Sequence, residues 1–217
     1  MRSKLTSKGL QQPSLKKSAV ILAGGFSKRF GREKGLTELF GRPLIDYVLD
    51  KVSGIVDEKI LVVSSEVQKC KFAAVTRNEV NIVVDELEIQ SPLIGALTGF
   101  KYAHGDYSVL LPCDTPFLSS QIISALLRLC INRHAVVPQW PNGYLEPLEA
   151  AYHTKSALAA AEAAAKCREL DLRSMISRLG KVEYVSTLVL RQLDPKLLTF
   201  FNVNTPEDLR EAESILE

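Results

Sequence analysis

The sequence is poor in the residues that usually form metal centres or disulfide frameworks. Its four cysteines, at positions 70, 113, 130 and 167, are far apart and form no CxxC pair, so neither a zinc site nor a disulfide framework is expected. Its three histidines, His104, His134 and His153, share no metal-ligand spacing. Any metal ion should therefore be held by carboxylates.

Long apolar runs and a large net charge are also missing. No run reaches about 18 apolar residues, and the N-terminus lacks the apolar core of a signal peptide. We therefore expect a cytoplasmic protein with no membrane contact. The formal net charge of +2 is too small for a general nucleic-acid binder, so any anion site must be local.

The composition is that of an ordinary folded protein. The 217 residues are 46% apolar and 24% charged, and this length fits one domain with a sizeable core. Residues 1–17 carry five basic side chains and no acidic one. We expect a mobile leader there, with an arm toward an acidic partner as the alternative, followed by one domain over residues 18–217.

Short aliphatic runs of strand length recur along the first two thirds of the chain, and each is too apolar for one of its faces to be exposed to solvent. They cover residues 18–23, 59–63, 81–84, 107–111 and 135–138. Helical segments open at Pro43, at Pro92 and after Ser119. This alternation predicts a Rossmann-like α/β fold, with a mostly parallel central sheet and helices on both faces.

The pattern changes after residue 138. Asn142-Gly143 suits a type I′ turn, and 147–152 suits a return strand, so we expect a small hairpin insertion over the edge of the sheet in the C-terminal half. Helices are expected over 156–167 and 170–179, and a last helix after Thr205, with Asp208 completing a capping box. Strands are expected near 182–185 and 199–203.

The stretch LAGGFSKRFGREKGL, residues 22–36, follows the first apolar run and combines a bare backbone with positive charge. Gly24 and Gly25 have no Cβ, so the chain can bend there and bring its amides against a ligand. The cationic side chains nearby include Lys28, Arg29, Arg32 and Lys34. The combination predicts a site for a polyanion, most simply a nucleoside triphosphate.

Two common phosphate motifs do not fit this loop. A Walker loop needs GxxxxGK[ST], but Lys34 is followed by Gly35 and Leu36 and no hydroxyl is present for magnesium. A dinucleotide fingerprint needs GxGxxG opening directly into a helix. The pattern that fits is LAGG-x-S-x-R-x-G-x-x-K.

That pattern resembles the signature of nucleotidyltransferases that activate sugars, terpenoid precursors or pterins. Three further motifs narrow the resemblance to the molybdenum cofactor guanylyltransferase family: SPLIGAL at 91–97, LPCDTP at 111–116 and FNVNTPEDL at 201–209. The matches run in order from about residue 18 to the C-terminus. The resemblance thus identifies 18–217 as a single nucleotidyltransferase domain.

The resemblance implies Mg²⁺-dependent transfer of GMP from GTP to the terminal phosphate of molybdopterin, or of its molybdenum-loaded form, with release of pyrophosphate. Transient contact with other cofactor-assembly proteins is a further expectation. Two alternatives stay open. One is a cytidylyl- or uridylyltransferase for another pterin, a sugar or an isoprenoid phosphate. The other is a nucleotide sensor of the same fold without turnover.

Attack on the α-phosphorus loads charge onto phosphate oxygens, so catalysis requires fixed positive charge. We predict that Arg29 and Lys34 supply it, although each could be a solvated surface cation. Asp114 follows the strand 107–111 at the ligand-binding edge of the sheet and is predicted to hold Mg²⁺. The amides predicted to surround the phosphates are those of Leu22, Ala23, Gly24 and Gly25.

The remaining site predictions rest mainly on the resemblance. Asp85 and Ser64 are predicted in the nucleotide pocket, Ser64 where relatives often carry Asn, with a plain strand-end turn as the alternative for Asp85. The helix start Pro92, Leu93 and Gly95 is predicted to shape the base pocket. Asn202 and Asn204 have strand spacing that places both amides on one face, and the family implies that they bind the acceptor; Asn204 could equally stabilise the turn into the last helix.

Two neighbouring features have weaker predictions. Cys113 beside Asp114 is expected to be a small buried side chain rather than a nucleophile, because the transfer needs none. Glu146 and Glu149 follow the hairpin turn. They could contact the acceptor pterin or be solvated turn charges.

Overall fold

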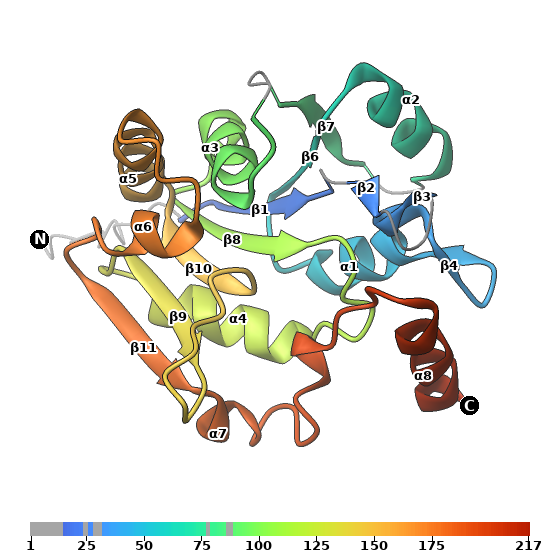
Figure 1. The fold of residues 1–217 in the computed structure, drawn as a ribbon. Helices are drawn as coiled ribbons and strands as arrows, with labels where there is room; N and C mark the ends of the chain where they lie inside the picture. The colour runs from blue at the N-terminus through green and yellow to red at the C-terminus, as the bar shows by residue number, and fades with distance from the viewer. Residues whose placement is uncertain (1–14, 24–25, 28–31, 77–78, 86–88) are drawn as a thin grey trace, which may run out of the picture.

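A seven-stranded mixed sheet forms the centre of the protein (Figure 1). The structure, a computed structural model, describes residues 15–23, 26–27, 32–76, 79–85 and 89–217. The strand order across the sheet is β11-β9-β10-β8-β1-β6-β7. The bounds of these strands are β1 Lys17–Leu22, β6 Glu58–Val63, β7 Asn81–Val84, β8 Tyr107–Pro112, β9 Ala135–Gln139, β10 Ala150–His153 and β11 Val182–Ser186.

Six of the seven strands run the same way. β1 lies between β8 and β6 in parallel register, and β6 pairs in parallel with β7, as β9 does with β11. β10 is antiparallel to both of its neighbours, β8 and β9. The predicted mostly parallel α/β fold is therefore confirmed, and the carboxyl ends of β1, β6, β7 and β8 meet at one edge of the sheet.

The expected hairpin exists, but its position and turn differ from the prediction. Its return strand β10 is inserted inside the sheet, between β8 and β9, rather than over an edge, and it begins only at Ala150. The turn runs from Trp140 to Gly143, closed by a 2.8 Å bond from the Gly143 amide to the Trp140 carbonyl oxygen. Its two central residues, Pro141 and Asn142, have no positive φ, so the turn is not type I′, which needs a positive φ at both.

Helices cover both faces of the sheet because alternate strand residues point to opposite sides. Ala19 and Ile21 of β1 pack in one apolar cluster with α1 and α4, whereas Val20 packs in the other with α3, α5 and α6. Figure 1 shows these two layers. The helix bounds are α1 Leu44–Val52, α2 Glu66–Val75, α3 Pro92–Tyr102, α4 Ser120–Leu129, α5 Thr154–Lys166, α6 Leu172–Ile176, α7 Thr187–Leu190 and α8 Pro206–Leu216.

Short polar residues begin several of these helices. The hydroxyls of Ser65, Ser91 and Ser119 accept backbone amides at the starts of α2, α3 and α4, and Pro92 occupies the first turn of α3. Thr205 and Asp208 form the predicted capping box of α8. The cap of α4 is thus Ser119 itself, five residues after Asp114.

Four short strands and two 3₁₀ turns complete the described elements. They are β2 Phe26–Ser27, β3 Arg32–Glu33, η1 Lys34–Leu36, β4 Glu38–Leu39, β5 Arg42–Pro43 and η2 Leu198–Phe200. Helix α2 was not expected from the sequence, and the expected helix over 170–179 is limited to α6. The predicted strand over 199–203 is wrong, since η2 and irregular backbone occupy this segment. Its Val203 amide instead donates a 2.9 Å bond to the carbonyl oxygen of Asp114, which attaches the segment to the end of β8.

Strand β1 begins within the basic N-terminal segment. The amides of Lys16 and Lys17 donate bonds of 2.9 and 2.8 Å to Asp106 and Asp57, so the chain is already held at these residues. Among the described residues, no helix is both long and apolar enough to cross a membrane.

Candidate active site at the carboxyl ends of the strands

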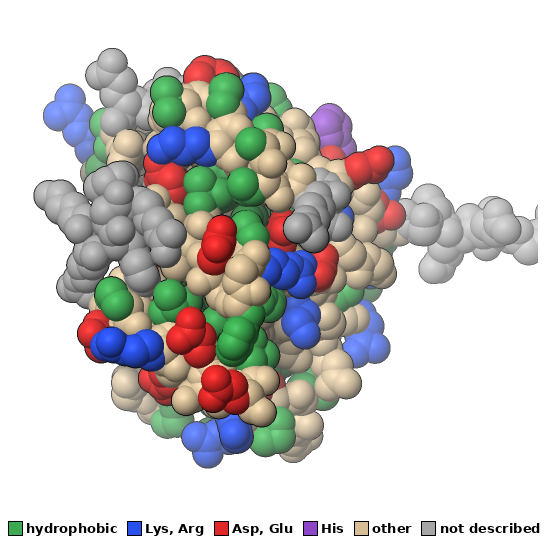
Figure 2. Space-filling view, turned by 90° about the vertical axis from the view of Figure 1, so that its right-hand side faces the viewer, with side chains coloured by type: hydrophobic (Ala, Val, Ile, Leu, Met, Phe, Trp, Pro, Cys, Tyr) green, Lys and Arg blue, Asp and Glu red, His purple; other side chains and the backbone are tan. Residues whose placement is uncertain are grey.

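A cavity of about 510 Å³ opens at the edge where β1, β6, β7 and β8 end. Figure 2 views the molecule from the side toward which β1 and β8 point in Figure 1, and apolar side chains run down the middle of this face with acidic and basic groups beside them. The cavity is lined by Leu22, Ala23, Lys34, Val62, Val63, Ser64, Asp85, Gln90, Ser91, Pro92, Gly95, Pro112, Cys113, Asp114, Leu148, Asn202 and Asn204.

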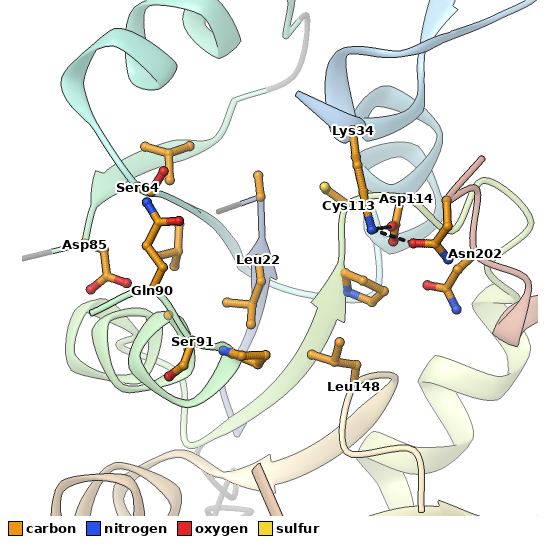
Figure 3. A pocket seen from close by; sticks show the side chains of 17 residues that line it. Leu22, Lys34, Ser64, Asp85, Gln90, Ser91, Cys113, Asp114, Leu148 and Asn202 are labelled. Atoms are coloured by element: carbon orange, nitrogen blue, oxygen red, sulfur yellow. Dashed lines mark hydrogen bonds and ion pairs between the residues drawn. The ribbon is translucent and has the colours of Figure 1, made fainter. Parts of the chain in front are cut away.

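One end of the cavity is organised around the ammonium group of Lys34 (Figure 3). Lys34 Nζ donates a 2.5 Å hydrogen bond to Oδ1 of Asn204 and lies 3.4 Å from Oδ2 of Asp114. Lys34 comes from η1, Asp114 from the end of β8, and Asn204 from the segment before α8. Three parts of the chain thus meet at one positive charge.

The carboxyl group of Asp114 is almost completely buried, with 6% of the residue exposed. Burial raises the pKa of this carboxyl above its ordinary value, and the nearby Lys34 ammonium opposes that rise. The backbone oxygen of Asp114 accepts the Val203 amide, and this bond brings Asn202 and Asn204 to the cavity without any strand pairing.

The opposite end of the cavity is polar but carries no cation among the lining residues that the structure describes. Ser64, Asp85, Gln90 and Ser91 lie there, with Leu22 between the two ends (Figure 3). Asp85 Oδ1 accepts a 2.6 Å bond from the Thr98 hydroxyl of α3. The amide and the hydroxyl of Ser64 both donate to Oε1 of Gln68, at 2.7 and 2.8 Å, so this hydroxyl presents only acceptor lone pairs to a ligand.

The structure brings most of the predicted residues together. Those that line the cavity are Leu22, Ala23, Lys34, Ser64, Asp85, Pro92, Gly95, Asp114, Asn202 and Asn204. Leu93 does not line it: the side chain is fully buried and packs in the apolar cluster under α3. Gly24, Gly25 and Arg29 lie outside the described residues.

Several lining residues were not predicted from the sequence. Gln90 and Leu148 carry no motif of their own, and Ser91 opens the motif SPLIGAL but was not assigned to the site. Cys113 is 6% exposed, and burial raises the pKa of its thiol, so it is a poor nucleophile, as expected. A Cβ on Gly35 would lie 3.1 Å from the Cys113 sulfur and 3.0 Å from Phe72, which leaves glycine as the residue that fits beside Lys34.

Of the two glutamates after the hairpin turn, Glu149 is buried and is not a solvated charge, whereas Glu146 is half-buried. Glu146 Oε1 accepts a 2.6 Å bond from the indole of Trp140. Glu149 is only 2% exposed, has φ +50°, and its Oε1 has no hydrogen-bond partner among the described residues. Burial raises the pKa of Glu149 well above its ordinary value, and the nearby Glu146 and Asp114 raise it further.

The donor set at Asp114 fits a magnesium ion that also binds a substrate phosphate. Within the described ranges no three His, Cys, Asp or Glu side chains converge to form a complete metal cage. Mg²⁺ commonly uses one or two carboxylates plus substrate phosphates and keeps several waters. The buried Asp114 carboxylate would be such a ligand, and it pairs with Lys34.

The cavity, with a cation and a buried carboxylate in its wall, lies at the carboxyl ends of parallel strands, where open α/β proteins bind their ligands. The chain belongs to the MobA-like NTP transferase domain family, whose model matches residues 19–182. The resemblance expected from the motifs is thus confirmed.

Curated relatives and a solved structure agree with this family. A protein of Methanosarcina mazei named "Probable molybdenum cofactor guanylyltransferase" is 32% identical over 198 residues, which cover 89% of this chain and 88% of that protein. The molybdenum cofactor guanylyltransferase of Desulfosudis oleivorans is 32% identical over 203 residues, 92% of this chain and 96% of that protein. The crystal structure of molybdopterin-guanine dinucleotide biosynthesis protein A from Archaeoglobus fulgidus superposes with a TM-score of 0.78 at 31% identity, over 92% and 98% of the two chains.

Proposed function

We propose that this protein is a molybdenum cofactor guanylyltransferase, which transfers GMP from GTP to the terminal phosphate of molybdopterin or its molybdenum-loaded form. In this reaction an acceptor phosphate oxygen forms a bond to the α-phosphorus of GTP. The bond from the α-phosphorus to the bridging oxygen breaks, and pyrophosphate leaves with the electron pair. Residues 18–217 would perform this as one domain.

The observation that carries the proposal is the position of Lys34 between Asp114 and Asn204 at one end of the cavity. Negative charge grows on the departing pyrophosphate and on the non-bridging α-oxygens, and a fixed ammonium stabilises it most where water is excluded. Lys34 is held in place by two partners before any ligand arrives. Little reorganisation is then needed in the transition state.

The two ends of the cavity suggest where each substrate binds. The triphosphate would lie against Ala23 and Lys34, with its base and ribose toward Ser64, Asp85 and Pro92. The acceptor phosphate would enter beside Asn202 and Asn204. Asp114 would hold Mg²⁺, which when bound acts as a Lewis acid on the phosphate oxygens.

The direct test is release of pyrophosphate from GTP with molybdopterin as acceptor, comparing the unaltered protein with Asp114→Ala. We expect turnover that needs Mg²⁺ and GTP and that is lost in the variant. A panel with CTP, UTP and ATP tests the base. Tighter binding and faster turnover of CTP or UTP would replace the guanylyl assignment by the cytidylyl or uridylyl alternative. Binding of GTP with no turnover on any acceptor would favour a nucleotide sensor.

A further inference from the structure

Helix α2 connects the two ends of the cavity through a single buried side chain, that of Gln68. Gln68 is 5% exposed. Its Oε1 accepts two hydrogen bonds from Ser64, at 2.7 Å from the amide and 2.8 Å from the hydroxyl. Its Nε2 donates a 2.6 Å bond to Oε2 of Glu33. Ser64 lines one end of the cavity, and Glu33 directly precedes Lys34 at the other.

The carboxylate of Glu33 is itself a buried group that depends on this bond. Glu33 is 6% exposed, and its other oxygen lies 3.4 Å from the ammonium of Lys71, a side chain that is 51% exposed. The Lys71 ammonium neutralises part of this buried charge from 3.4 Å, and a buried carboxylate that loses a hydrogen-bond donor is strongly destabilised in that position. Among the described residues, the Gln68 amide, at 2.6 Å, is the buried donor to Glu33.

A second contact from the same helix restrains the residue after Lys34. Phe72 lies one helical turn after Gln68, and its ring faces Gly35 so closely that an added Cβ would be only 3.0 Å from it. Helix α2 thus contacts both chain neighbours of Lys34: Gln68 donates a hydrogen bond to Glu33, and Phe72 packs against Gly35. The backbone oxygen of Lys34 accepts the Thr37 amide at 2.9 Å, which closes the 3₁₀ turn.

We propose that Gln68 is a positioning residue for the transfer reaction: by bonding Ser64 and Glu33 at once, it fixes the Lys34 turn relative to the nucleoside end of the cavity. The inference rests on the proposed function. Gln68 does not line the cavity and touches no substrate in this scheme. It acts through Lys34, whose ammonium must meet the phosphates within a fraction of an ångström.

The chemistry of the amide explains why this position needs glutamine. One side chain must accept from Ser64 and donate to a carboxylate, and the terminal amide of glutamine offers an acceptor oxygen and a donor nitrogen without being charged at any pH. Gln68→Met keeps the length of the side chain but leaves Glu33 and two Ser64 donors without their partner. We expect kcat for pyrophosphate release to fall tenfold to a hundredfold, with the KM for GTP changed less than threefold.

A double-mutant cycle with Lys34 separates positioning from a general structural role. If Gln68 acts through Lys34, Gln68→Met should change the residual rate of the Lys34→Met variant by less than about twofold, because the group that it positions is gone. Multiplicative losses in the double variant would overturn the proposal. So would a Gln68→Met variant that folds, binds GTP and keeps its kcat.

If Gln68→Met does not fold, matched variants at Glu33 test the same hydrogen bond from its other end. Glu33→Gln retains an acceptor for the Gln68 amide and should keep kcat within about threefold, while Glu33→Leu should lose tenfold or more. Equal activity of these two variants would also overturn the proposal. Lys69→Met, on the solvent side of the same helix beside Glu66, serves as the control, with kcat expected within twofold. Failure of the unaltered protein to release pyrophosphate would contradict the proposed function. Failure of the double-mutant cycle in an active protein would contradict only the role of Gln68.

Discussion

The ammonium of Lys34 donates a 2.5 Å hydrogen bond to the side-chain oxygen of Asn204, although the two residues are 170 positions apart in the sequence. Asp114, 3.4 Å from the same nitrogen, completes the group. The amide and the carboxylate hold the ammonium at the wall of a cavity large enough for a nucleotide.

Replacing Lys34 by methionine should remove the positive charge while keeping the length of the side chain. Because the charge is needed most in the transition state, we expect kcat to fall by about 10²- to 10³-fold with a smaller change in the KM for GTP. Steady-state kinetics of pyrophosphate release measure this. Lys69→Met, on the exposed surface of α2 beside Glu66, is the control and should leave kcat within twofold. Equal rates for the two variants would contradict the role of Lys34.

The two asparagines should differ in their effects, although they lie two residues apart. Asn204 bonds Lys34, whereas Asn202 lines the cavity and donates a 3.2 Å bond to the Phe200 carbonyl oxygen. Asn204→Ala should therefore lower kcat by about tenfold through the freed ammonium. Asn202→Ala should mainly raise the KM for the acceptor. Kinetics with each substrate varied in turn would show this, and identical effects would contradict the separation.

Glu149 should make the protein less stable as the pH rises. Its pKa is raised in the folded state by burial, so the folded protein binds its proton more tightly than the unfolded chain. This contribution is complete below the unfolded pKa of about 4.3 and is lost as the pH rises from there toward the folded pKa, by up to about 1.4 kcal/mol per pH unit. Glu149→Gln cannot ionise, so its Tm should exceed that of the unaltered protein at pH 8.

Thermal unfolding between pH 4 and 8 tests this sign. The Tm values of the unaltered protein and of Glu149→Gln should be similar at pH 4 and should diverge as the pH rises above 4. Glu162→Gln, on the exposed face of α5, is the matched control and should follow the unaltered protein throughout. A Glu149→Gln curve parallel to that of the unaltered protein would show that Glu149 ionises equally in both states.

Glu58 should have the opposite dependence. Burial raises the pKa of this carboxyl, but hydrogen bonds outweigh that effect and lower it, first among them the 2.5 Å bond from the Ser18 hydroxyl, with the amides of His104 and Gly105. A lowered folded pKa gives stability that is present above the unfolded pKa and lost as the pH falls through the folded pKa. Ser18→Ala should cost about 1 kcal/mol at pH 7 in urea unfolding, since the carboxylate is partly solvated.

The cost of Ser18→Ala should shrink near pH 3, where Glu58 is protonated in more of the molecules. Thr76→Ala, which removes a 2.9 Å hydroxyl bond to the Phe72 carbonyl oxygen, has no carboxylate partner and should cost the same at both pH values. A Ser18→Ala cost that did not change with pH would show that the hydroxyl is not linked to the ionisation of Glu58.

Much of the site could be predicted because it depends on local chain features. The apolar run of β1 followed by a glycine-rich, basic loop predicts a phosphate site, and Asp114, two residues after β8, lies where parallel strands end. Capping signals such as Thr205 with Asp208 are also local, and the structure has that capping box. The roles of the individual site residues remain predictions.

Other features could not be predicted, because the partners are distant in sequence. The spacing of Asn202 and Asn204 suggested a strand, but the Val203 amide bonds the carbonyl of Asp114 instead of a neighbouring strand. Strand β10 forms backbone hydrogen bonds with β8 on one side and β9 on the other. No turn signal in the sequence indicates this position inside the sheet. The sequence by itself determined that the apolar segments form parallel strands and that a glycine-rich, basic loop follows the first of them. Only tertiary packing decided that Gln68 bonds Glu33 across 35 residues and that Glu149 is buried, because burial and hydrogen-bond partners are properties of the folded chain.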